Sequence, residues 1–137
     1  MKEETRKKVA SCRALQGMTV RELCETERFR ENLAAYQKAQ REDREAVRAS
    51  YKAMRKLGGA KGYKLPSHPI DHVIMMSTEM LAKEFTAILA GKSSLPLSQR
   101  RYIEQLADQA YNLTVVQYVV EEFPELEEEL LPKAKNN

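Results

Sequence analysis

Apolar residues recur three and four positions apart along most of the chain, which is the spacing of one face of an α-helix. The longest such run covers residues 20–57, where neither glycine nor proline interrupts the sequence. Thr19 and Glu22 stand three positions apart at its start, the spacing of a helix-capping box. The pattern predicts one long amphipathic helix over about residues 20–57, roughly 57 Å in length.

A narrow apolar stripe runs along this predicted helix when the residues are projected at about 100° intervals. Gln40 and Asp43 interrupt the stripe, and two helices broken near residues 41–43 are the alternative to one continuous helix. A narrow seam favours pairing with another helix, as in a short coiled coil, over deep burial. We therefore predict that the stripe binds a partner. Its six residues are Phe29, Leu33, Tyr36, Val47, Tyr51 and Met54.

Shorter elements are predicted on either side of the long helix. Residues 3–16 form a charged helix that Gly17 ends. The glycines and prolines of residues 58–69 predict a linker. Further helices are expected over residues 70–90, 98–120 and 125–131. The β-branched residues near 114–120 favour a strand by propensity, but helical spacing continues through them and predicts a helix.

These elements predict an all-α fold, a helical bundle of four to five helices with one long amphipathic helix. Residues 1–137 form a single helical domain, with a basic half (1–57) and a compact apolar half (70–137) joined by the linker. Cys12 and Cys24 lie within helical patterns and are expected to be reduced, partly buried thiols. Neither a secretory signal pattern nor a membrane-spanning run occurs, so we expect a cytoplasmic protein without membrane contact.

The net charge of +3 is unevenly distributed along the chain. Residues 1–64 contain 17 basic and 9 acidic residues, a net charge of +8, whereas residues 65–137 contain 6 and 11, a net charge of −5. This division indicates either a polyanionic partner or attraction between the two halves. A basic ridge, about 21 Å long, follows the long helix and suits non-specific contact with phosphates. Its residues are Arg41, Arg44, Arg48, Lys52 and Arg55.

Two short motifs resemble metal and nucleotide sites. His68 and His72 are four positions apart, but Pro69 keeps His68 out of the helix, so we predict no metal site. The sequence AGKSS at residues 90–94 resembles the end of a phosphate-binding loop without its first glycine. Gly91 is better explained as the residue that ends a helix.

Two further patterns have structural explanations. Residues 107–120 faintly resemble a helix-turn-helix, but the recognition helix would offer neither arginine nor lysine to DNA. A small-molecule pocket between the helices at 70–90 and 98–120 is another alternative. Its lining would be Met75, Met76, Met80 and Tyr111, although methionines at this spacing usually fill a core.

The sequence therefore predicts a non-enzymatic module for protein–protein interaction or oligomerisation that acts through the long helix. We expect a homo-oligomer or a helical protein partner, with no cofactor, metal or small-molecule substrate. The alternative function is non-sequence-specific nucleic-acid binding by the basic half.

Overall fold

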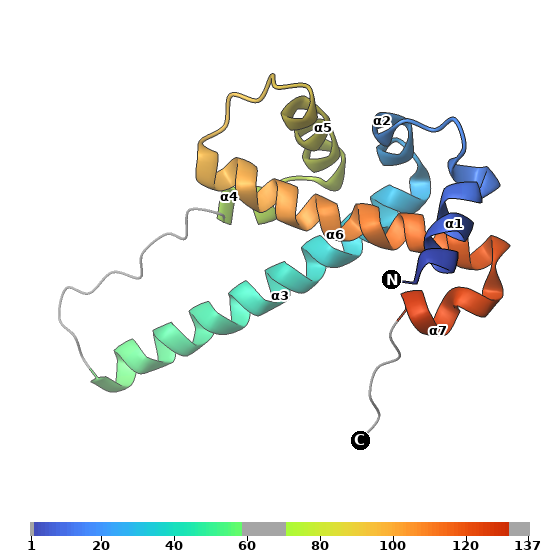
Figure 1. The fold of residues 1–137 in the computed structure, drawn as a ribbon. Coiled ribbons are helices and arrows are strands. Elements are labelled where there is room, and N and C mark those ends of the chain that lie inside the picture. The colour runs from blue at the N-terminus through green and yellow to red at the C-terminus, as the bar shows by residue number, and fades with distance from the viewer. Residues whose placement is uncertain (1, 59–70, 132–137) are drawn as a thin grey trace.

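The computed structural model describes the backbone of residues 2–58 and 71–131, and the side chains of these residues except 47, 48, 50–58 and 71. Every regular element in these ranges is a helix, which confirms the all-α bundle (Figure 1). The elements in chain order are α1 (Glu3–Ser11), η1 (Arg13–Leu15), α2 (Val20–Cys24), α3 (Glu27–Gly58), α4 (Asp71–Ile74), α5 (Thr78–Leu89), α6 (Leu97–Glu122), η2 (Pro124–Leu126) and α7 (Glu127–Leu130).

Two long helices, α3 and α6, cross at the centre of the molecule and share the largest contact between elements (Figure 1). The short helix α4 and the longer α5 pack against both of them, and α2 packs against α3 and α5. At the other end of α6, the chain turns through η2 into α7, beside α1 (Figure 1). The described chain is therefore organised around one helix crossing.

The main core lies between α2, α3, α4, α5 and α6. The rings of Phe29 on α3 and Phe85 on α5 stack at its centre, with centroids 6.3 Å apart. Because both the basic and the apolar halves of the sequence supply core residues, the two halves fold around a shared interior. Its buried members are Cys24, Phe29, Leu33, Val73, Met76, Leu81, Ala82, Phe85, Ile103, Leu106, Ala107 and Ala110.

A smaller apolar cluster joins α1 and η1 to the C-terminal elements. Cys12, Val119 and Leu126 are its buried members. Cys12 and Cys24 are free thiols, as the sequence predicted, and they are fully rather than partly buried. Burial raises the pKa of Cys24 to about 11, so this thiol stays protonated at neutral pH.

The long helix begins later than the sequence predicted. The Thr19 hydroxyl accepts from the backbone amide of Glu22 (3.1 Å), which confirms the predicted cap, but this cap starts the separate five-residue helix α2. A second cap starts α3, because the hydroxyl of Thr26 accepts from the amide of Phe29 (3.2 Å). From Glu27 the 32 residues of α3 continue without a break at 41–43, over roughly 48 Å.

The single helix predicted over residues 70–90 is two helices. The chain leaves helical geometry between Ile74 and Thr78, and the hydroxyl of Ser77 accepts from the amide of Met80 (3.2 Å) to start α5. The sequence analysis missed this cap because the apolar spacing continues through both helices. Gly58 is the last residue of α3, and the rest of the predicted linker lies outside the described residues.

The C-terminal predictions fit the structure closely. The β-branched residues 114–120 lie within α6, one uninterrupted helix, rather than in a strand or a helix-turn-helix. Gly91 has a φ of 70° just after α5, and its amide donates to the carbonyl of Ile88 (3.0 Å). This residue ends a helix, as expected. The segment predicted at 125–131 forms η2 and α7.

Candidate functional site

The first half of the predicted partner stripe belongs to the protein's own core. Phe29 and Leu33 are fully buried, and Tyr36 is half-buried against the main core. A side chain with no exposed surface cannot meet a partner, so this part of the predicted binding site is corrected to a packing role. The spacing along α3 did not predict this burial, because the helices that contact it, α5 and α6, are distant in the sequence.

Two polar residues of α3 clamp the turn between α4 and α5. The amide of Gln37, which is 3% exposed, donates to the carbonyls of Ile74 (3.1 Å) and Met76 and accepts from the hydroxyl of Thr78 (3.0 Å). One turn later, Nη2 of Arg41 also donates to Ile74 (2.9 Å). These bonds satisfy carbonyls that the end of α4 leaves without helical partners.

The C-terminal half of α3 projects beyond the other helices (Figure 1). The remaining stripe positions, Val47, Tyr51 and Met54, occupy this part of the helix, where their spacing places them on one face. Their side chains lie outside the described set. The structure therefore divides the six predicted partner residues into three that pack internally and three on the projecting segment.

The basic ridge is divided in a similar way. Arg41 belongs to the clamp and is only partly exposed, so it is not a freely solvated ridge residue. Arg44 lines a cavity between α3 and α6. Arg48, Lys52 and Arg55 follow on the projecting segment, and their side chains are outside the described set. The predicted nucleic-acid surface thus begins at Arg44.

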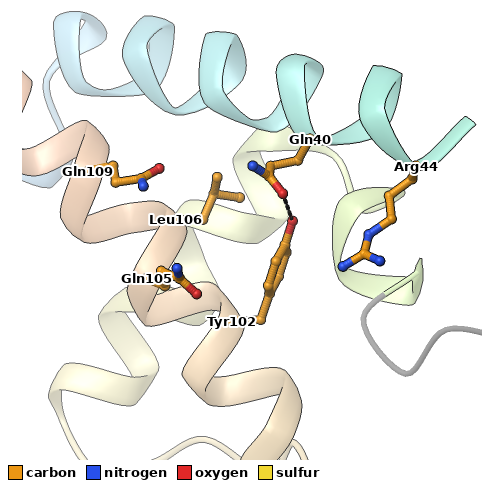
Figure 2. A pocket seen from close by; sticks show the side chains of 6 residues that line it. All are labelled: Gln40, Arg44, Tyr102, Gln105, Leu106 and Gln109. Atoms are coloured by element: carbon orange, nitrogen blue, oxygen red, sulfur yellow. Dashed lines mark hydrogen bonds between the residues drawn. The ribbon is translucent and has the colours of Figure 1, made fainter. Parts of the chain in front are cut away.

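The cavity beside Arg44 has a volume of about 290 Å³ and is lined mainly by polar side chains (Figure 2). The hydroxyl of Tyr102 donates to Oε1 of Gln40 (3.0 Å) and ties α6 to α3 across it. Sequence reasoning found Arg44 but missed the α6 contribution, because positions on α6 join those on α3 only through the helix crossing. The described lining is Gln40, Arg44, Tyr102, Gln105, Leu106 and Gln109.

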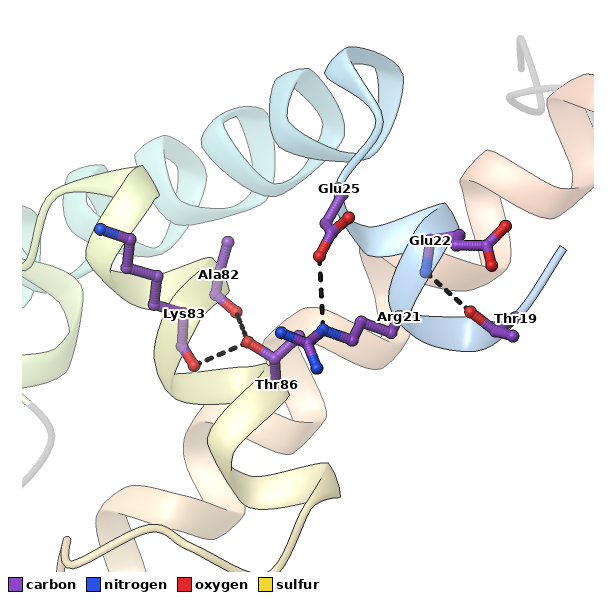
Figure 3. A network of polar contacts seen from close by, with 7 residues as sticks. All are labelled: Thr19, Arg21, Glu22, Glu25, Ala82, Lys83 and Thr86. Atoms are coloured by element: carbon purple, nitrogen blue, oxygen red, sulfur yellow. Dashed lines mark hydrogen bonds and ion pairs between the residues drawn. The ribbon is translucent and has the colours of Figure 1, made fainter.

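A second hollow, of about 420 Å³, lies between α2 and α5 and is mostly apolar. Val20 and Leu89 line it and remain 45% and 52% exposed. On its α2 side Arg21 pairs with Glu25 (3.3 Å). On α5 the Thr86 hydroxyl donates to the backbone carbonyl of Lys83 (2.8 Å), as Figure 3 shows. These polar groups are engaged close to their own positions in the chain. The cavity beside Arg44 is therefore the better candidate for binding a polar ligand.

Opposite charges of the two sequence halves meet at α1 and the C-terminal elements. Lys8 pairs with Glu125 (3.0 Å), and the Arg13 amide donates to Glu122 (2.6 Å). The Thr5 hydroxyl donates to Glu129 (2.7 Å), whose carboxylate lies at the amino end of α1. One ion pair and two hydrogen bonds to acidic side chains therefore join the basic half to the acidic half here.

The remaining candidate residues do not converge. His72 is exposed on α4, and His68 lies outside the described residues. Met76 is buried and Tyr111 packs against the core, whereas Met75 and Met80 are 67% and 56% exposed. The four residues of the alternative small-molecule pocket therefore have different surroundings and do not form its lining.

Fold and surfaces together place the described chain among all-α bundle proteins, with one helix extending beyond the bundle and a polar cavity beside Arg44, between α3 and α6. No family model, curated protein or solved structure matches the chain. Across residues 2–58 and 71–131, none of the helices combines the length and the apolar character needed to cross a membrane.

Proposed function

We propose that this protein is a non-enzymatic association module whose projecting half of α3 pairs with the same segment of a second copy. The observation that carries the proposal is the continuation of α3 as a helix to Gly58, past the helices that cover its first half (Figure 1). The stripe positions Val47, Tyr51 and Met54 lie on that continuation.

The energetics of helix formation favours a partner that covers the apolar face of the projecting segment. The projecting segment continues a packed helix and needs no new nucleus, but most helix stability in proteins comes from packing of an apolar face. Its stripe is the kind of narrow seam that pairs with another helix. A second copy is the favoured occupant because most soluble oligomers are built from identical subunits around a two-fold axis.

Sedimentation equilibrium between about 1 and 100 μM tests the proposal. The wild-type protein is expected to shift from monomer to dimer mass in this range. Tyr51→Asp and Met54→Asp should each keep the protein monomeric, because a carboxylate in an apolar seam is strongly disfavoured.

Ala49→Asp is the matched control. Position 49 is exposed on the opposite face of the same helix, so this change adds the same charge and should leave the dimer intact. A wild-type protein that stays monomeric throughout contradicts the proposal. Equal loss of dimer in all three variants would also contradict it, because the apolar face would then have no special role.

A further inference from the structure

The cavity between α3 and α6 combines one cationic side chain with several amides. Arg44 is the only charged residue among the described residues that line it. Figure 2 shows Arg44 reaching down from α3 beside Tyr102, while Gln105 and Gln109 come from α6. The cavity has the size of a small ligand group, at the lower end of the range for binding pockets.

The hydrogen bond across the cavity fixes which polar groups are donors. Because Oε1 of Gln40 accepts from the Tyr102 hydroxyl, the Gln40 amide nitrogen is a donor, and it points toward Leu106, away from Arg44 (Figure 2). Burial raises the pKa of Tyr102, and the positive charge of Arg44 lowers it to a smaller extent. The phenol therefore stays protonated at neutral pH and keeps its donor role. This end of the cavity suits an anionic group.

The α6 side of the cavity suits a planar polar group. The amides of Gln105 and Gln109 each offer a donor and an acceptor, the combination that pairs with the edge of a nucleobase. Leu106 forms the buried floor of the cavity, and the partly exposed Tyr102 supplies an aromatic ring. A cationic side chain and an aromatic ring are the elements of single-stranded nucleic-acid binding, and the two amides add hydrogen-bonding groups for a base.

The basic positions of α3 extend this site along the helix. Arg48, Lys52 and Arg55 follow Arg44 at intervals of three to four residues, on one flank of the helix. That flank adjoins the stripe proposed to pair with a second copy but does not coincide with it.

We propose that the groove between α3 and α6 binds single-stranded nucleic acid, with one unpaired base against Gln105 and Gln109 and its phosphate at Arg44. A single strand is favoured over a duplex because the cavity accommodates one base, and base edges are exposed only when the strand is unpaired. This inference is separate from the proposed self-association, because the cavity residues of α3, Gln40 and Arg44, precede the pairing positions Val47, Tyr51 and Met54 along the helix.

Fluorescence anisotropy with labelled twelve-nucleotide DNA and RNA strands, at about 50 and 200 mM salt, tests the inference. Arg44→Gln should weaken binding and reduce the slope of log affinity against log salt by about one, because one phosphate contact is lost. Gln105→Leu combined with Gln109→Leu should weaken binding roughly tenfold while leaving the salt slope unchanged. Stronger binding of either strand identifies the sugar that the site prefers.

Lys38→Gln is the control, because Lys38 is exposed on another face of α3 and its replacement removes the same charge. It should leave the affinity within about twofold. Competition with a duplex of the same sequence and with polyglutamate completes the test. Absence of binding at 50 mM salt, equal binding of duplex, equal displacement by polyglutamate, or an unchanged affinity in the glutamine double variant would each overturn the inference. Circular dichroism of each variant verifies that the fold is retained.

Discussion

The two halves of α3 belong to one uninterrupted helix but have different surroundings. In the first half, Phe29 and Leu33 are fully buried and Gln37 bonds to the turn after α4. In the second half, the helix continues past its neighbours (Figure 1). The apolar spacing is the same in both halves. The same spacing therefore does not by itself indicate whether other helices of the same chain cover the apolar face.

Replacement of a core residue gives the largest expected difference between the halves. Phe29→Ala should lower the free energy of unfolding by about 3–5 kcal/mol, because it removes a buried ring that stacks on Phe85. Met54→Ala should change it by less than about 0.5 kcal/mol when the protein is dilute and monomeric. Urea unfolding near 1 μM measures both values. Comparable losses would show that the projecting half packs within its own chain, and the comparison would fail.

The polar clamp gives the next largest effect. Gln37→Leu should lower the free energy of unfolding by about 1–3 kcal/mol, because the buried carbonyl of Met76 loses its side-chain donor and that of Ile74 keeps only Arg41. Lys38→Leu at the adjacent exposed position serves as the control and should stay within about 0.5 kcal/mol. Amide hydrogen exchange should also accelerate at residues 73–78 in Gln37→Leu alone. Equal exchange in both variants would show that the clamp does not hold this turn.

Much of the fold was predictable because it depends on local patterns. The helical spacing, the Thr19 cap and the helix end at Gly91 were all read correctly from neighbouring residues. The breaks before α3 and α5 were missed because Thr26 and Ser77 lie within continuous apolar spacing, which a cap does not interrupt. The available signal in both places was a threonine or serine whose hydroxyl can accept from the backbone amide three positions later.

The candidate site was less predictable because it depends on contacts between distant residues. Arg44 stood out as part of the basic ridge, but its neighbours Tyr102, Gln105 and Gln109 lie some sixty residues away and come together only where α3 crosses α6. The sequence pattern did not single out Gln37. Its importance follows from carbonyls on another helix, which no spacing along α3 reveals.

The polar contacts between α1 and the C-terminal elements give the smallest effect. Their loss can be measured separately from any change in the main core. A hydrogen bond from Thr5 is the main cause that lowers the pKa of Glu129 below its ordinary value of 4.5. The pKa of Glu125 is also lowered, first by its own backbone amide and then by Lys8. Stability from a carboxylate with a lowered pKa is present above the unfolded value and is lost as pH falls through the folded value. The attachment of α1 should therefore weaken only below about pH 4.5.

An NMR titration from pH 7 to 3 measures this weakening directly. The methyl signals of Val9, in the small apolar cluster beside α1, should shift with a midpoint below 4.5, while those of Leu33 in the main core stay constant over the same range. Glu129→Gln should remove part of the Val9 transition, because the amide cannot ionise, and leave the part due to Glu125. A midpoint above 4.5 would mean that another group controls α1. A parallel shift at Leu33 would mean that acid loosens the whole bundle, and that the contacts of α1 with Glu125 and Glu129 do not weaken separately from the main core.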